Sequence, residues 1–251
     1  MDKNILKIYG LTGAYCKFMG ITKMPKFKVK TFKGGNASAY ISYQNNSQIF
    51  NIEENYINVL KQNALPLIYH EFTHIVDNES FLPEVSAKTK IPFIKMLSEY
   101  RAIQVQMKIS MNFETYNEDK KFSFDDKTHD WFEEKTVKED IVYKTEDFVA
   151  TIKNLLSKKE NNYTYFLVLH CVYYQSMCDF WKEYCINEVQ HLLKEDIINT
   201  LFGLEFDIFH HMLSKIDNKD INYFKLLLSS QNKMVGYFGL YEDEIIKTLS
   251  V

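Results

Sequence analysis

Leu67-Ile68-Tyr69-His70-Glu71-Phe72-Thr73-His74-Ile75-Val76 is the stretch of this 251-residue sequence that decides the fold, and it contains a His-Glu-x-x-His motif. Residues four apart lie on one face of an α-helix, so His70 and His74 can both point at a single metal ion. Glu71 lies one step further round the helix, close enough to act on a water molecule held by that metal. The spacing therefore predicts a helix that carries a catalytic metal site.

Apolar residues on the opposite face support the helical interpretation. They recur at the three- and four-residue spacing of a helix that packs on a core: Leu65, Ile68, Phe72, Ile75 and Val76. Pro66 fits the first turn, where its missing N–H does no harm, and the polar pair Asp77-Asn78 suits the end of the helix. The alternative is an ordinary amphipathic helix with two histidines on its solvated face.

Length and charge limit the class of protein. A chain of 251 residues can bury a substantial core, as one large domain or two small ones. Its net charge of −3 argues against a nucleic-acid binder, which would carry a basic face. The most apolar segment, 163–181, is too short and too interrupted by polar side chains for a membrane span. The start of the sequence lacks the features of a secretory signal, so a cytoplasmic location is expected.

The four cysteines form neither a disulfide framework nor a zinc-binding pattern. Cys171, Cys178 and Cys185 are seven residues apart on one helical face, where consecutive members are too distant to be bridged. No Cys-x-x-Cys pair accompanies them or Cys16. We therefore expect reduced thiols in the core and no cysteine-based zinc site.

The pattern around the motif predicts an α+β protein. A helix is expected at 5–19, and three strands at 26–32, 37–43 and 48–52 form a small, mostly antiparallel sheet packed on the motif helix. A short helix at 54–61 precedes the motif. From residue 90 onward the sequence is nearly all helical, with helices expected at 92–111, 141–158, 163–187, 189–202, 204–215 and 219–230.

A charged, turn-rich stretch divides the chain. Residues 117–130 include Asp125-Asp126-Lys127 and few large aliphatic side chains, as expected of an exposed loop. We therefore expect a metal-binding core over 1–115, a loop or boundary over 116–130, and a helical region over 131–251 packed on the core.

A catalytic zinc site needs a third protein ligand beside the two histidines. The longer motif His-Glu-x-x-His-x-x-Gly-x-x-His is excluded, because position 77 is Asp and position 80 is Ser. Glu99 is the favoured third ligand, since it lies on the next expected helix and shares a face with the small Ala102. A small side chain one turn away lets that helix approach its neighbour closely, as a short carboxylate ligand requires.

Other carboxylates stay open as alternatives. Glu84 and Glu79 also follow the motif, and so does Asp77, which lies only three residues past His74 and is better suited to capping or orienting. Glu99 itself has the simpler interpretation of a solvated charge on an amphipathic helix.

A strand-rich segment, the His70-Glu71-x-x-His74 helix and a glutamate on the next helix together resemble the zincin metallopeptidases of the gluzincin type. The resemblance covers residues 25–110. It implies a zincin-like fold, with His70, His74 and Glu99 as ligands of a Zn²⁺ cofactor and Glu71 as general base.

The chain departs from the gluzincin pattern at one position. Gluzincins often carry Asp four residues after the ligand glutamate, whereas this sequence has Ile103. Such partners fix the tautomer and orientation of a metal ligand. Another group, such as Gln106 or a backbone carbonyl, is expected to orient the metal ligand instead.

The expected function is zinc-dependent hydrolysis of a protein or peptide. Glu71 would accept a proton from the zinc-bound water and later deliver it to the leaving amine. One further side chain would stabilise the oxyanion. The candidates for it are Tyr100, Arg101, His129, His170, His210 and His211. By analogy with zincins, the strand at 48–52 is expected to present an edge to an extended substrate.

Two other functions stay open. A catalytically idle zincin scaffold could bind a partner protein through the C-terminal helices, although the intact Glu71 argues against it. A zinc hydrolase could also act on a non-peptide amide. The aromatic-rich second half suits either a substrate lid or a partner-binding surface, and neither nucleic acid nor a membrane is an expected partner.

Overall fold

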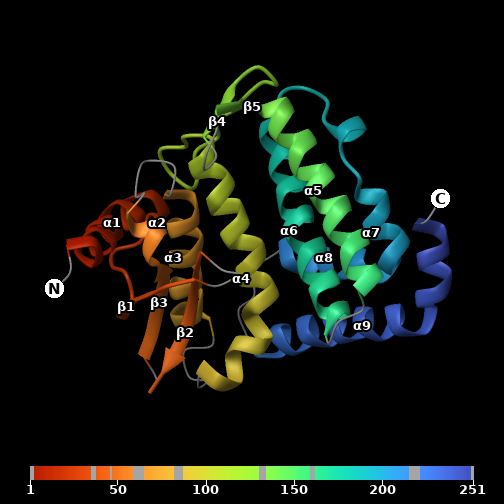
Figure 1. The fold of residues 1–251 in the computed structure, drawn as a ribbon, viewed down its shortest axis with the longest axis horizontal. Helices are drawn as coiled ribbons and strands as arrows, with labels where there is room; N and C mark the ends of the chain where they lie inside the picture. The colour runs from red at the N-terminus through yellow and green to blue at the C-terminus, as the bar shows by residue number, and fades with distance from the viewer. Residues whose placement is uncertain are drawn as a thin grey trace.

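The structure is a computed structural model that describes residues 3–34, 38–45, 47–58, 65–81, 87–129, 134–158, 162–214 and 221–249. It confirms the predicted α+β class (Figure 1). The elements are α1 (Lys3–Met19), β1 (Phe27–Phe32), β2 (Ala39–Gln44), β3 (Ser47–Glu53), α2 (Glu54–Asn58), α3 (Leu65–Ser80), α4 (Ala87–Ser110), β4 (Lys127–His129), β5 (Glu134–Thr136), α5 (Val137–Lys158), α6 (Tyr163–Tyr184), η2 (Gln190–Leu192), α7 (Glu195–Phe202), α8 (Leu204–Ser214) and α9 (Ile221–Leu249).

The three-stranded sheet is mixed, which corrects the prediction of a mostly antiparallel one. Its order is β1-β3-β2, with β2 and β3 antiparallel and β1 parallel to β3. The chain passes from β1 to β2 and leaves a place between them that β3 then fills. The strand at 48–52 is consequently the central one, and the prediction that it offers a free edge was wrong. Alternating side chains identify a strand but carry no information about its neighbours.

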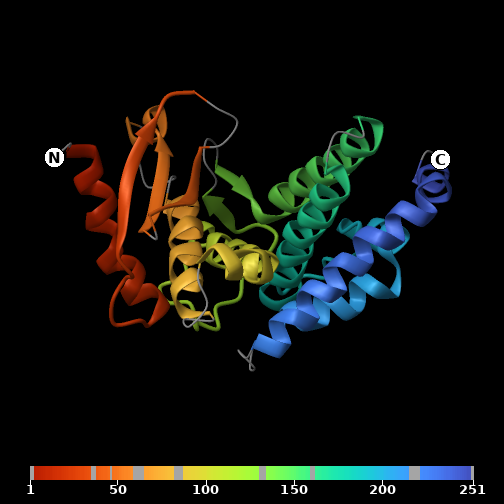
Figure 2. The same cartoon turned by 90° about the horizontal axis from the view of Figure 1, so that it is seen from below.

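The motif helix α3 lies between the sheet and α4. Figure 2 shows α1, the sheet, α3, α4 and then the C-terminal helices in succession across the molecule. The apolar stripe predicted for α3 is buried, with Ile68, Phe72 and Ile75 each at most 1% exposed. The Phe72 ring contacts the ring of Phe50 at a centroid distance of 5.8 Å, which ties the helix to β3. Burial of this stripe supplies the driving force that holds α3 in place.

A buried ion pair joins α3 to α4. Asp77, which is fully buried, accepts a hydrogen bond from the Arg101 guanidinium, and that guanidinium lies over the Phe81 ring at 5.3 Å. The helix α3 continues past the predicted end at Asp77-Asn78 and stops at Ser80, so Asp77 makes this contact from within the helix. The next helix, α4, begins at Ala87 rather than at Pro92. The pair fixes how the two helices lie against each other.

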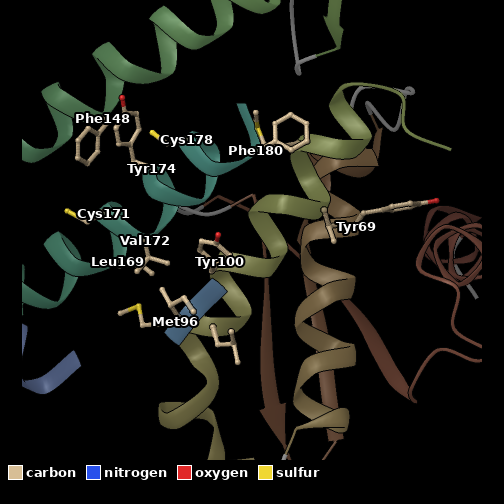
Figure 3. Packing of buried hydrophobic residues seen from close by; sticks show 14 of the residues in the cluster. Tyr69, Met96, Tyr100, Phe148, Leu169, Cys171, Val172, Tyr174, Cys178 and Phe180 are labelled. Carbon is tan, nitrogen blue, oxygen red and sulfur yellow. The ribbon is translucent and has the colours of Figure 1, made fainter. Parts of the chain in front are cut away.

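The second half packs on the other side of α4. Figure 3 shows Met96 and Tyr100 of α4 beside Leu169 and Val172 of α6. On the far side of α6, the Tyr174 ring stacks on Phe148 of α5, with centroids 4.1 Å apart. One continuous set of buried side chains therefore connects the helices on both sides of α4.

Several details of the second half differ from the sequence expectation. Residues 127–129, predicted as loop, form β4 and pair with β5 as an antiparallel ladder. The last helix, α9, runs to Leu249 instead of ending near residue 230. All four cysteines carry free thiols, with Cys171 and Cys178 buried on α6, as predicted. None of the described helices combines the length and the apolar character needed to cross a membrane.

Candidate metal centre

Three side chains predicted as ligands meet between α3 and α4. The Nε2 atoms of His70 and His74 are 3.1 Å apart. The Oε2 atom of Glu99, from α4, lies 3.4 Å from the first and 3.3 Å from the second. The histidine and glutamate side chains are only 10–15% exposed. These three donor atoms form a nearly equilateral triangle in a largely buried site.

The size of this triangle matches a zinc ion. Zinc bonds to histidine nitrogen at about 2.0–2.1 Å and to carboxylate oxygen at about 2.0–2.2 Å. At tetrahedral angles these bond lengths separate neighbouring ligand atoms by about 3.3–3.4 Å. The observed separations of 3.1, 3.4 and 3.3 Å are close to that value. The two histidines and Glu99 thus fit three corners of a tetrahedron and leave the fourth open.

Glu71 is the second carboxylate beside the histidine pair. Its ligand oxygen and the ligand nitrogens of His70 and His74 lie within 4.8 Å of one another, a wider set than the one that includes Glu99. In the part of the chain that the structure describes, Glu71 Oε2 is buried and has no hydrogen-bond partner. Burial raises the pKa of Glu71, against the opposing effect of the two histidines. Glu71 therefore lies next to the donor triangle with one oxygen unused.

His74 and Glu99 form an ion pair. Burial lowers the pKa of His74, but the Glu99 carboxylate overcomes this and raises it to about 9. Burial likewise raises the pKa of Glu99, yet His74 beside it holds that pKa well below its ordinary range. The carboxylate of Glu99 is consequently ionised, as a metal ligand must be.

Ser98 orients one of the two histidines. Its Oγ lies 2.7 Å from Nδ1 of His74, so the hydroxyl hydrogen-bonds to the ring nitrogen that faces away from the donor triangle. Such a partner fixes the ring and its tautomer. The expectation named Gln106 or a backbone carbonyl instead, and Gln106 lines a neighbouring cleft. In the sequence, the adjacency of Ser98 and Glu99 could have indicated this contact. Neighbouring residues of one helix can contact different atoms of the same side chain, here that of His74.

Ser98→Ala is expected to lower zinc affinity by about 10–100-fold, the usual cost of losing an outer hydrogen-bond partner of a metal ligand. The imidazole of His74 would lose the contact that holds its orientation. Competition with a chromophoric chelator measures the change. Ser110→Ala, at the other end of the same helix, is the matched control and should leave affinity unchanged; equal values for both variants would refute the role of Ser98.

Tyr173, on α6, is a further residue at the site that sequence reasoning missed. Its phenol interacts with Glu99, and burial together with the Glu99 and Glu71 carboxylates raises its pKa. The hydroxyl therefore keeps its proton at neutral pH. Tyr173 lies in the apolar run of α6, where an aromatic side chain normally indicates core packing, so its position beside α4 could not be read from the sequence.

The six side chains predicted as oxyanion donors have other contacts, line the neighbouring cleft or are exposed. Tyr100 and His210 both hydrogen-bond to Asp179, and Arg101 pairs with Asp77. His129 on β4 and His211 on α8 are exposed. The sixth, His170, lines the cleft beside Tyr173.

Of the alternative carboxylates, Glu79 and Asp77 are not part of the donor triangle. Glu79 is exposed near the end of α3, and Asp77 is engaged by Arg101. Glu84 lies outside the described residues.

Comparison of the chain with protein-family models, with curated proteins and with solved structures finds no match, so the site stands on its own geometry.

Proposed function

We propose that this protein is a zinc-dependent metallopeptidase of zincin-like construction. In this proposal His70, His74 and Glu99 hold the zinc ion, and Glu71 is the general base. The observation that carries it is the triangle of donor atoms at 3.1, 3.3 and 3.4 Å, which has the dimensions of a zinc site and one open corner. Catalytic zinc characteristically has three protein ligands and an open fourth position.

Zinc in this position would lower the pKa of a coordinated water and polarise the carbonyl of the bond to be cleaved. Glu71 would accept a proton from that water through its unused Oε2 and pass it to the leaving amine. The pKa of Glu71 is raised by burial, which brings it toward the neutral range where a group that both accepts and donates a proton works best.

Tyr173 is the side chain that we assign to the oxyanion. It remains protonated because burial raises its pKa, and its hydroxyl, which lies near Glu99, would turn to donate its single proton to the oxyanion. A fixed donor at this place would stabilise the negative charge that develops on the carbonyl oxygen. This assignment replaces the six residues that the sequence suggested.

An extended substrate would pair with β2 rather than with β3. In the described sheet β3 is enclosed by β1 and β2, so its main chain has no free side. β2 is an edge strand and contacts α3, which carries the two histidines. Main-chain hydrogen bonds to such an edge are a common means of holding an extended peptide.

Of the two alternatives, the idle scaffold is the weaker. A buried Glu71 carboxylate oxygen without a hydrogen-bond partner costs stability, and a scaffold that only binds a partner gains nothing from it. The non-peptide amidase has one observation in its favour: the donor side chains are only 10–15% exposed, which suits a small substrate. It would use the same ligands and the same base.

Zinc removal tests this function. The zinc-loaded protein should cleave an unfolded protein substrate, lose that activity when a chelator removes the metal, and regain it with zinc but not with magnesium. Magnesium prefers octahedral oxygen ligands, and the two histidines present nitrogen. Mass spectrometry of the products provides the measurement. Cleavage that survives complete zinc removal would disprove the proposal, as would fully loaded protein that hydrolyses neither peptides nor simple amides.

A further inference from the structure

A cleft of about 260 Å³ opens between α4, α5 and α6, next to the donor triangle. Tyr173 connects the two places, because it lines the cleft and its phenol interacts with Glu99. On α4, Ile103 and Gln106 line the cleft one and two turns beyond Glu99, on the same helical face. The cleft therefore lies further along α4 from Glu99.

The charged groups in this cleft come from one face of α5. Asp140 is 3% exposed and its Oδ1 lies 3.1 Å from the Nζ of Lys144, while Asp147 is exposed one turn further along. No ion pair found among the described residues involves Asp147. On the facing helix α6, burial lowers the pKa of His170 against the opposing effect of Asp147, so its ring is neutral at neutral pH. Two carboxylates and one ammonium leave the cleft with a net negative charge.

The size and walls of the cleft suit a single long side chain. Its volume of about 260 Å³ falls below the range of about 300–1,000 Å³ typical of pockets for whole small molecules. Met107 of α4 and Met177 of α6 are apolar walls that would pack against a methylene stem. Lysine and arginine bury such stems and keep their charged ends near polar groups.

We infer that this cleft is the specificity pocket of the enzyme and receives a lysine or arginine side chain of the substrate. The stem would lie between the two methionines, and the cationic end would reach Asp147. The inference rests on the proposed function, because the substrate is taken to be a peptide whose cleaved bond lies at the zinc site.

Binding to zinc-loaded Glu71→Gln protein tests the pocket without hydrolysis. The probes are fluorescein-labelled peptides that are identical except for one central residue, which is Arg, Gln or Glu. The Arg peptide should bind about two- to fivefold more tightly than the Gln peptide, the effect of a charge pair with an exposed carboxylate, and the Glu peptide more weakly than either. Fluorescence anisotropy measures the three affinities.

Charge-changing substitutions on α5 identify the residue that produces the preference for the Arg peptide. Asp147→Lys should abolish the preference for Arg. The isosteric Asp147→Asn should reduce that preference, and it remains a usable test if the charge reversal in Asp147→Lys impairs folding. Glu146→Lys is the matched control, because Glu146 is the exposed neighbour on α5 and does not line the cleft. Equal binding of the Arg and Gln peptides would overturn the inference, and so would an equal loss from Glu146→Lys.

The two proposals fail in different ways. If Arg preference and its loss in Asp147→Lys are observed but the wild-type protein hydrolyses none of the peptides, the pocket stands and the metallopeptidase proposal falls. If the wild-type protein hydrolyses all three peptides equally and binding shows no preference, the metallopeptidase proposal stands and the pocket falls.

Discussion

Glu71→Gln should abolish hydrolysis and leave zinc in place. The amide keeps the size of the carboxylate but cannot accept the proton of the attacking water, so kcat should fall by about 10²–10⁴-fold, the usual contribution of a general base. Zinc should be retained because Glu71 lies outside the compact donor triangle that the two histidines form with Glu99. Metal analysis and product formation are measured on the same sample.

Glu79→Gln is the matched control for this experiment. Glu79 lies on the same helix, is exposed, and is remote from the donor atoms, so its amide should behave like the wild-type protein. The assignment of Glu71 as base would be wrong if Glu71→Gln kept full activity with zinc bound. Loss of zinc from Glu71→Gln would instead make Glu71 a ligand.

Glu99→Ala should release zinc. The substitution removes one of three protein ligands and the only anionic one, so the loss of affinity should exceed the about 10–100-fold expected for an outer partner such as Ser98. The site also loses the carboxylate that raises the pKa of His74 in the metal-free protein. Isothermal titration with zinc at fixed pH measures the affinity, and circular dichroism checks that the helices are intact.

A pair of substitutions separates the two carboxylates. Glu99→Ala should bind zinc far more weakly than Glu71→Ala, because only the Glu99 oxygen lies within 3.4 Å of both histidine nitrogens. The reverse order of affinities would show that Glu71 completes the site and that the base must be sought elsewhere.

The cluster of donor side chains could be predicted because helical periodicity alone brings His70 and His74 to one face. Placing Glu99 beside them needed one more step, namely that the next helix packs closely on α3 and carries a small residue near its carboxylate. Ala102 is indeed fully buried at that contact. Local rules therefore determined which atoms could meet around a metal ion.

Other features depend on tertiary packing and left no local signal. The alternating pattern of the strands predicted where they lie but not that β3 separates β1 from β2. Tyr173 comes from α6 and reaches Glu99 only because α6 packs on α4. The start of α4 at Ala87 differs from the predicted start at Pro92, because proline favours the first turn of a helix but here lies inside one.

A zinc-edge anomalous difference map from crystals grown with zinc tests the central claim most directly. The account predicts one strong peak per chain, about 2.0–2.2 Å from Nε2 of His70, Nε2 of His74 and a carboxylate oxygen of Glu99. Glu71 should lie beside the peak without bonding to it. A peak bonded to Glu71 in place of Glu99, or no peak between α3 and α4, would contradict the account.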